Sequence, residues 1–185
     1  KFTSSGKLVD TLEVKIDSND PYNKIGEIMV RGENVMYGYY KNIEATEQSI
    51  DKDGWLRTGD LGLIDKENFV YIKGRNKSVI LGPSGENIYP EEIEVKLNNM
   101  PYVQESVIVE KEGNLIALVY PDLELVDREN ISESRLSEIM ENTKKEVNQT
   151  LAKYMQISKI KIYPEEFAKT PKRSIKRFLY TGNDL

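Results

Sequence analysis

The stretch that divides the chain is residues 72–94, which read IKGRNKSVILGPSGENIYPEEIE. Residues 74–78 are polar and offer no side chain to a hydrophobic core, so we expect a boundary between two folded parts there. The apolar run at 79–81 predicts a short strand. The next four residues, 82–85, combine two glycines with a proline and a serine and predict a loop.

The residues beyond this stretch predict a compact α+β domain. Pro90 fits the first turn of a helix, in which Ile93 and Leu97 lie four residues apart and face the core. The apolar runs 103–109 and 115–120 predict a β-hairpin around a polar turn.

A long helix and a final strand complete this second part. We expect Asn130 and Glu133 to form the cap pair at the start of the helix, and Ile160 and Ile162 to begin the last strand. The apolar stripe of the helix consists of Leu136, Ile139, Met140, Val147 and Leu151.

The part before the boundary reads as strands and turns. Apolar and polar residues alternate there with the period of a half-buried strand, which indicates an antiparallel β-meander. One short helix is predicted at 43–50, with Asn42 as its N-cap. The strands are expected at 12–16, 28–30, 61–64 and 69–73.

Composition narrows the chemistry. The 185 residues include no Cys and no His, which excludes disulfides, thiolate nucleophiles, Cys-based zinc sites and His-dependent triads. No apolar run approaches the ~18 residues of a membrane-spanning helix. The chain has neither an initiating Met nor a signal peptide, so we expect an excised piece of a cytoplasmic protein.

The charge is uneven. The formal net charge is −5, yet five of the basic residues gather in one short run near the C-terminus. This basic island on an acidic chain indicates an anionic partner, or alternatively a solvated tail. The run consists of Lys169, Lys172, Arg173, Lys176 and Arg177.

Three further places could carry chemistry. In Thr58-Gly59-Asp60 the carboxylate could accept hydrogen bonds from both hydroxyls of a ribose, although a lone tripeptide of this kind is more often a tight turn. Arg75 could clamp a phosphate or a ribose, or could be a solvated surface residue. The loop at 82–85 could hold a phosphate, but no Gly-Lys-Ser/Thr follows it, so it is not a Walker motif.

Each of these signals is weak alone, whereas their order and spacing are specific. Read together, the blocks at 53–62, 72–77, 85–94 and 170–177 resemble the adenylate-forming superfamily of acyl-CoA synthetases, luciferases and peptide-synthetase adenylation domains. The block at 26–40 also fits. The motif Gly-Glu-Asn-Ile-Tyr-Pro at 85–90 looks most like the corresponding sequence of the long-chain fatty acid CoA ligases.

The resemblance implies an α+β architecture in two parts. Residues 1–76 would be the antiparallel, β-rich end of a large N-terminal AMP-binding domain. Lys77 would be the hinge, and residues 78–185 would be a small mobile C-terminal domain with a three-stranded-type sheet and helices. The missing N-terminal domain would be the partner of this chain in the same protein.

The resemblance also implies an activity. Such enzymes activate a carboxylate with ATP to an acyl-adenylate and pyrophosphate, and then transfer the acyl group to a thiol, usually that of CoA. Asp60, Arg75 and Thr58 would bind the nucleotide. Gly82, Ser84 and Gly85 would face CoA after the small domain rotates.

The full-length enzyme would therefore use ATP, Mg²⁺, CoA and a fatty acid. The resemblance implies no nucleic-acid partner and no transmembrane segment, and it leaves peripheral membrane contact open. The family's phosphate loop lies upstream of these residues, so we expect the fragment to be inactive and to bind no cofactor tightly.

One departure concerns the catalytic lysine. The family places its adenylation lysine where this chain has Ser174. Because residues i and i+2 of an extended segment point to the same side, we expect Lys172 to replace it, with Arg173 as the rival. The alternatives are a non-catalytic partner-binding module on the same scaffold, or an adenylation domain for another carboxylic acid.

Overall fold

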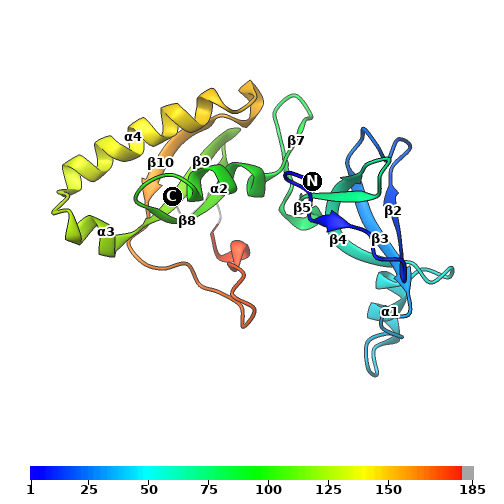
Figure 1. Cartoon of the computed structure of the whole chain (residues 1–185). Coiled ribbons are helices and arrows are strands. Elements are labelled where there is room, and N and C mark those ends of the chain that lie inside the picture. The colour runs from blue at the N-terminus through cyan, green and yellow to red at the C-terminus, as the bar shows by residue number, and fades with distance from the viewer. Residues whose placement is uncertain (181–185) are drawn as a thin grey trace. The chain divides into compact units, whose positions relative to one another are not determined.

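The alternating segments of the first part pair into one five-stranded sheet, in the order β1-β5-β4-β3-β2, and every neighbouring pair is antiparallel (Figure 1). Its core consists of Ile16, Ile28 and Ile64, with other aliphatic side chains packed around them. The strands are β1 (Gly6–Lys7), β2 (Leu12–Asp17), β3 (Gly26–Gly32), β4 (Leu56–Ile64) and β5 (Phe69–Arg75). The predicted meander is confirmed.

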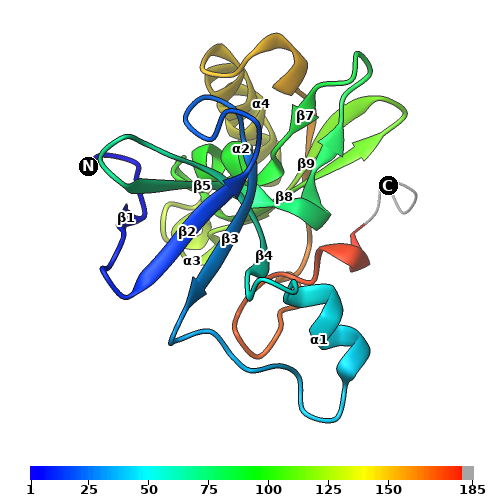
Figure 2. The same cartoon turned by 90° about the vertical axis from the view of Figure 1, so that its right-hand side faces the viewer.

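The short helix α1 (Ile43–Ser49) lies beyond the ends of β2 and β3, where Figure 2 shows it in cyan. Its N-cap is Asn42, as predicted, because the Asn42 side chain accepts a hydrogen bond from the Ala45 amide at 3.0 Å. The loop before it exposes three tyrosines, and Tyr37 and Tyr40 are 105% and 88% exposed.

Trp55, the only tryptophan of the sequence, is held between two cations. The Lys15 Nζ atom lies 4.3 Å from the centre of its ring, and the guanidinium carbon of Arg31 lies 4.6 Å from that centre. Both distances are within cation–π range, so the turn that carries Trp55 is tied to β2 and β3.

The structure is a computed structural model that describes residues 1–180. It divides into two compact units, Lys1–Val79 and the residues from Ile80 onward. The short 3₁₀ segment η1 (Asn76–Ser78) ends the first unit. The second begins with a small hairpin of β6 (Ile80–Leu81) and β7 (Asn87–Ile88).

The second unit is built on a three-stranded sheet in the order β10-β9-β8. Strands β8 (Val103–Lys111) and β9 (Asn114–Pro121) form the predicted antiparallel hairpin, while β10 (Ile157–Ile162) runs parallel to β9. The helices are α2 (Pro90–Asn98), α3 (Leu123–Arg128) and α4 (Glu133–Gln149), with 3₁₀ segments η2 (Lys153–Met155) and η3 (Arg177–Leu179). The expected α+β class is confirmed.

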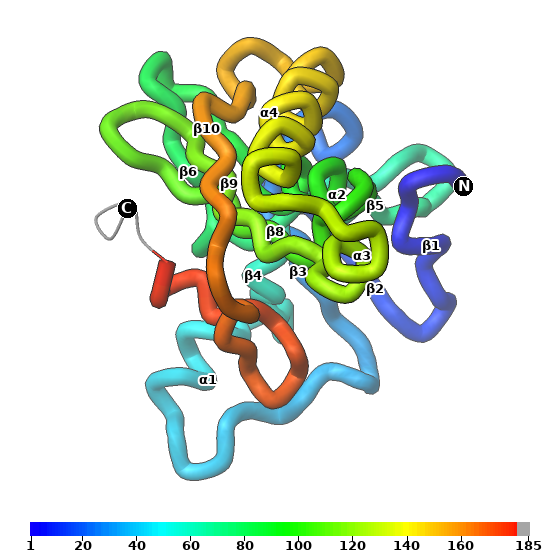
Figure 3. Tube along the Cα trace, turned by 90° about the vertical axis from the view of Figure 1, so that its left-hand side faces the viewer, coloured from blue at the N-terminus to red at the C-terminus, as the bar shows by residue number. Residues whose placement is uncertain are grey.

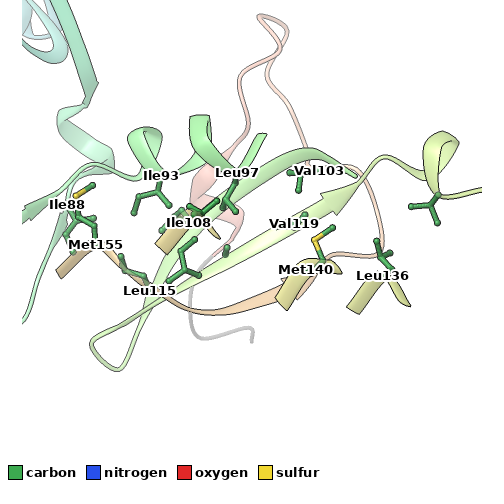
Figure 4. Close-up of a cluster of buried hydrophobic side chains, with 14 residues drawn as sticks. Ile88, Ile93, Leu97, Val103, Ile108, Leu115, Val119, Leu136, Met140 and Met155 are labelled. Atoms are coloured by element: carbon green, nitrogen blue, oxygen red, sulfur yellow. The ribbon is translucent and has the colours of Figure 1, made fainter. Parts of the chain in front are cut away.

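The two faces of this sheet pack against different parts of the chain. Leu115, Ala117 and Val119 of β9 belong to the larger core, together with Ile93 and Leu97 of α2 (Figure 4). The alternate residues of β9 face the other way, because successive side chains of a strand point to opposite faces. There they pack with the buried Phe167 of the C-terminal segment, whose path from β10 is traced in Figure 3.

The start of α4 differs from the prediction. Ser132 is the N-cap, and its hydroxyl accepts the Arg135 amide at 3.3 Å. Asn130 instead has a φ of 53° directly after α3, the left-handed position at which helices commonly end. The predicted pair of Asn130 and Glu133 is therefore wrong, because Asn130 serves the preceding helix. Leu151 lies beyond the end of α4 but packs against the same core.

Candidate functional site

Asp60 and Arg75 lie next to each other on neighbouring strands of the first sheet. They are register partners on β4 and β5, and the Arg75 Nε atom lies 2.7 Å from Asp60 Oδ1. The Arg75 side chain is 65% exposed and that of Asp60 27%. The sheet thus presents a carboxylate and a guanidinium side by side, both accessible to a ligand.

A bulge in β4 places Asp60 there. Leu61 pairs with Glu27 of β3 and Arg57 with Met29, so Thr58, Gly59 and Asp60 stand opposite a single residue. Such bulges re-aim side chains and are frequent beside active sites. Thr58-Gly59-Asp60 is therefore part of a bulged strand and not an isolated tight turn.

Two residues hold this bulge in shape. Gly59 has a φ of +73°, a conformation that glycine adopts without strain, and its amide donates to Glu27 Oε1 at 3.1 Å. The Thr58 hydroxyl donates to the Ile28 carbonyl at 2.7 Å and accepts the Asp60 amide at 3.0 Å. Thr58 therefore orients Asp60, and its hydroxyl is already engaged within the chain.

Lys77, the expected hinge, is an exposed residue in the middle of η1. It follows β5 directly and precedes the second unit. Packing alone does not locate a pivot, so the boundary at Lys77 and the hinge role stay predictions.

The loop at 82–85 closes the hairpin of β6 and β7. The Gly82 amide donates to the Glu86 carbonyl at 2.8 Å, and Gly85, with a φ of +88°, donates its amide to Gly82 at 2.9 Å. Ser84 is exposed at the tip. The loop is a tight, ordered turn with a free outer surface.

A pocket of about 230 Å³ lies beside this loop within the second unit. Its walls include Gly82, Pro83, Asn114, Lys153, Tyr154 and Gln156. The residues of η2 were missed by the sequence analysis. No motif marks them, because they reach the loop only through the fold of α4 and β10.

The basic run near the C-terminus forms a short hairpin. Lys169 bridges to Ile175, and the Thr170 amide donates to the Ser174 carbonyl at 2.8 Å. Arg173 has a φ of 62° at the turn. Lys172, Arg173 and Ser174 are exposed at its tip. The expectation of an extended segment is wrong here, because hydrogen bonds within the hairpin curl the chain, so Lys172 and Ser174 do not share a strand face.

Two other members of the run, Lys169 and Arg177, are held by carboxylates. The Lys169 Nζ atom lies 2.8 Å from Glu105 Oε1 and also contacts Glu166. Arg177 binds both carboxylate oxygens of Glu94 on α2, with Nη1 2.6 Å from Oε1. The run is thus not uniformly solvated: its ends are tied to the domain and its tip is exposed.

Glu94 is the buried partner in this arrangement, at 6% exposure. Its Oε1 atom also accepts the Ile108 amide of β8 at 2.7 Å. Burial raises the pKa of the Glu94 carboxyl, although Arg177 and the Ile108 amide act in the opposite direction. Burial alone would lower the pKa of Arg177, but the hydrogen bonds to Glu94 and the negative charges of Glu94 and Glu91 together outweigh it and raise that pKa.

Two kinds of site are absent from residues 1–180. These residues contain no group of three or more acidic side chains arranged to hold a metal ion. None of the helices described combines the length and the apolar character that crossing a bilayer requires.

Comparison with known proteins adds to this geometry. The family model described as "AMP-binding enzyme C-terminal domain" matches residues 77–181. A 2-succinylbenzoate–CoA ligase of Bacillus cytotoxicus is 43% identical over 114 residues, which are 60% of this chain and 23% of that protein. A long-chain-fatty-acid–CoA ligase of Gallus gallus is 37% identical over 120 residues, 64% of this chain and 16% of that protein.

A solved structure resembles nearly the whole chain. It is the O-succinylbenzoate coenzyme A synthetase of Bacillus subtilis in complex with AMP, with a TM-score of 0.75 and 31% identity. The match covers 96% of this chain and 35% of that one. The chain therefore spans about a third or less of the length of these three proteins.

Proposed function

The chain belongs to the AMP-binding enzymes of the adenylate-forming superfamily, whose C-terminal domain it contains, and from this premise we propose that it acts as the C-terminal part of an ATP-dependent acid–thiol ligase. In this proposal the whole enzyme transfers the AMP group of ATP to a carboxylate, which forms an acyl-adenylate and releases pyrophosphate. It then transfers the acyl group from the adenylate to the thiol of CoA and releases AMP.

The pair of Asp60 and Arg75 carries this proposal. An ionised carboxylate accepts hydrogen bonds only, so Asp60 is suited to the two hydroxyls of a ribose. Arg75 lies 2.7 Å away and adds a planar donor for the ribose or a phosphate of the same nucleotide. In this proposal both residues bind ATP, and Thr58 supports them through the Asp60 amide.

The loop formed by Gly82, Ser84 and Gly85 is proposed to face CoA. Its backbone is held by the hydrogen bonds between Gly82, Gly85 and Glu86, and Gly85 leaves open space where a side chain would stand, so a pantetheine chain could approach closely there. ATP requires Mg²⁺, but residues 1–180 provide no acidic cluster for a cation. In our proposal these described residues therefore take no part in holding the metal.

A long-chain fatty acid is the acid that we propose. The Gly-Glu-Asn-Ile-Tyr-Pro wording and the Gallus gallus relative support it. The Bacillus cytotoxicus relative acts on a different acid, as its name states, so the acid is the part of the proposal that most needs a direct test. An adenylation domain for another carboxylic acid is the alternative.

The partner in the proposal is a preceding N-terminal domain of the same protein. Tyr37, Tyr40 and Ile43 support this, because they are 105%, 88% and 76% exposed, and large apolar side chains gathered on one loop and at the start of the helix that follows it indicate a contact surface. The proposal places the enzyme in the cytoplasm, where ATP and CoA are both available, and it includes no nucleic acid. Peripheral contact with a membrane surface stays a prediction.

One observation favours a second function. Ser174 stands where the family has its adenylation lysine, so the chain could be a non-catalytic module that binds a partner. An intact phosphate loop in the upstream part of the protein would favour the ligase, and a degenerate loop would favour the module.

Acid-dependent exchange of pyrophosphate into ATP tests the function. We expect exchange by the full-length protein with palmitate, followed by thioester formation when CoA is added. The 185-residue chain alone should show neither exchange nor tight ATP binding by calorimetry, because the phosphate loop is missing. Exchange by the short chain would contradict our placement of the site, and its absence from the full-length protein with every acid tried would favour the non-catalytic module.

Lys77→Pro tests the hinge in the same full-length protein. Proline fixes φ and removes an amide donor, so a residue that must change its backbone angles should tolerate it in only one of two domain orientations. We expect one half-reaction to persist and the other to be lost. The matched control is Lys73→Gln, since Lys73 lies within β5 just before η1. Equal loss of both half-reactions would argue against the hinge.

A further inference from the structure

The C-terminal segment is clamped onto the sheet of the second unit on both sides of its hairpin. Before the hairpin, Phe167 is 2% exposed and its ring lies 5.0 Å from that of Tyr180 and 5.1 Å from that of Tyr163. The Ala168 amide donates to the Tyr180 hydroxyl at 2.6 Å. The base of the hairpin is therefore fixed by aromatic packing.

The two arms of the hairpin are then tied to different elements. On the first arm, Lys169 reaches Glu105 of β8 at 2.8 Å. Directly after the second arm, Arg177 binds Glu94 of α2 through two nitrogens. The arms are joined by the Thr170 amide to Ser174 and by the Lys176 amide to Ala168, both at 2.8 Å.

The geometry of the contact between Arg177 and Glu94 is suited to orienting the C-terminal segment. A bidentate guanidinium–carboxylate pair sets direction as well as energy. The third contact, from the Ile108 amide to Glu94, fixes the carboxylate itself. Burial of an ion pair seldom adds net stability compared with apolar side chains of similar size, so stability alone gives little reason for this pair.

We propose that Glu94 and Arg177 are positioning residues, which fix the direction in which the exposed tip of Lys172, Arg173 and Ser174 is presented for adenylation. This inference rests on the proposed function and extends it to a residue pair separated by 83 positions. A displacement of about 1 Å at a reacting group can cost about a hundredfold in rate. Among the described residues the tip has no ion pair of its own, so its placement depends on the ion pairs at its base, of which Arg177 with Glu94 is the bidentate one.

Backbone dynamics of the 185-residue chain test the positioning without any assay of activity. In the unaltered chain we expect amide ¹⁵N order parameters near 0.85 at 170 and 172–175, the value of a rigid backbone; Pro171 has no amide hydrogen. In Glu94→Gln they should fall toward about 0.6, while those of β8 and β9 stay unchanged. Glutamine keeps an acceptor for the Ile108 amide but removes the charge and the symmetric grip on Arg177.

The matched control for dynamics is Arg135→Gln. Arg135 pairs with Glu138 at 2.6 Å in the same unit, but both side chains are more than half exposed and lie on α4. This variant should leave the order parameters at 170–175 unchanged. Unchanged values in Glu94→Gln, or an equal fall throughout the unit, would overturn the positioning role.

Kinetic measurements on the full-length protein are the second test of the positioning role. Arg177→Lys keeps the charge but not the two parallel hydrogen bonds, so adenylate formation should slow about a hundredfold. Thioester formation from a supplied acyl-adenylate should be spared, which a general loss of folded protein would not allow. Equal loss of both half-reactions would contradict the proposal. If the unaltered protein forms no adenylate, the proposed function fails, and the order parameters still decide the positioning.

Discussion

Two pairs of arginine and carboxylate, one in each unit, have the same chemistry and opposite surroundings. Asp60 and Arg75 join neighbouring strands at the surface, with the arginine 65% exposed. Glu94 and Arg177 join a helix to the C-terminal segment, with the carboxylate 6% exposed and a backbone amide as a third partner. The first pair can exchange its partner for a ligand, whereas the second has its hydrogen bonds satisfied within the domain.

The difference shows that burial decides what an ion pair does. An exposed pair contributes about 0–1 kcal/mol to stability, so evolution can use it for binding at little structural cost. Removing one partner of a buried pair costs about 3–5 kcal/mol, because a charge is left without compensation. In our proposals, an arginine–carboxylate pair therefore serves a ligand in the first unit and the placement of the C-terminal hairpin in the second.

The largest expected effect comes from Arg177→Ala in the second unit. We expect its free energy of unfolding to fall by about 3–5 kcal/mol, because Glu94 would stay buried without its cation. Urea unfolding followed by far-ultraviolet circular dichroism reports the helices of this unit, while Trp55 fluorescence reports the first. Arg135→Ala, which removes an exposed pair in the same unit, should cost no more than about 1 kcal/mol. A similar cost for both variants would erase the distinction between buried and exposed pairs.

Lys172→Ala should have the next largest effect, and on rate instead of stability. A unit charge pair at ~4 Å and an effective dielectric near 20 interacts by roughly 4 kcal/mol. In the full-length protein we therefore expect adenylate formation to slow about a hundred- to a thousandfold, with thioester formation from acyl-adenylate spared. Arg173→Ala is the matched control at the same tip. Normal adenylation in Lys172→Ala, with slow adenylation in Arg173→Ala, would transfer the role to Arg173.

Asp60→Ala should weaken nucleotide binding and leave the fold intact. Hydrogen bonds to a charged group contribute about 1.5–3 kcal/mol, so the ATP affinity of the full-length protein should fall about ten- to a hundredfold. The urea midpoint seen by Trp55 should move little, because the lost pair is exposed. Glu67→Gln, which removes an exposed partner of Lys1 in the same unit, is the control for affinity. A large loss of stability in Asp60→Ala would show that this pair is structural as well.

The smallest effect is the opposite response of the two units to acid. The Lys1 ammonium, together with the Phe69 and Glu67 amides and the Tyr71 hydroxyl, lowers the pKa of Asp65. Its contribution to stability is thus present above its usual pKa of 3.8 and is lost as the pH falls below that value. The pKa of Glu94 is raised, so its contribution has the other sign: ionisation above the usual 4.5 costs stability, and acid restores it.

Variants isolate these contributions from those of other carboxylates. Between pH 6 and 3, the stability difference between the unaltered chain and Asp65→Asn, followed by Trp55 fluorescence, should shrink as the pH falls. As the pH falls over the same range, the stability of the unaltered chain relative to Glu94→Gln, followed by circular dichroism, should rise. Parallel trends in both units would contradict the assigned pKa directions.

Much of the second unit was predictable because its signals are local. The apolar runs at 103–109 and 115–120 specify a hairpin through alternation and a polar turn, and β8 and β9 form it. The stripe on α4 likewise follows from helical periodicity. The cap of α4 was not predictable from the same rule, since Asn130 and Ser132 both suit a helix start and only the end of α3 distinguishes them.

The candidate site divides in the same way. Order and spacing of motifs indicated Asp60, Arg75 and the loop at 82–85, because each motif is short and contiguous. The bulge that aims Asp60 depends on the pairing of β4 with β3, which no stretch of β4 contains. The expected extended segment around Lys172 failed for a related reason, as the hairpin is closed by Lys169 and Ile175 across the turn.

The sequence by itself determined the α+β class, the polar stretch without core residues at 74–78, the absence of thiol and imidazole side chains and the family. These depend on composition, periodicity and short motifs, which are written along the chain. Only the tertiary structure decided that β10 runs parallel to β9 and that Arg177 meets Glu94. Both depend on where a distant segment returns, and the energy of a buried charge is set by the neighbours that exclude water from it.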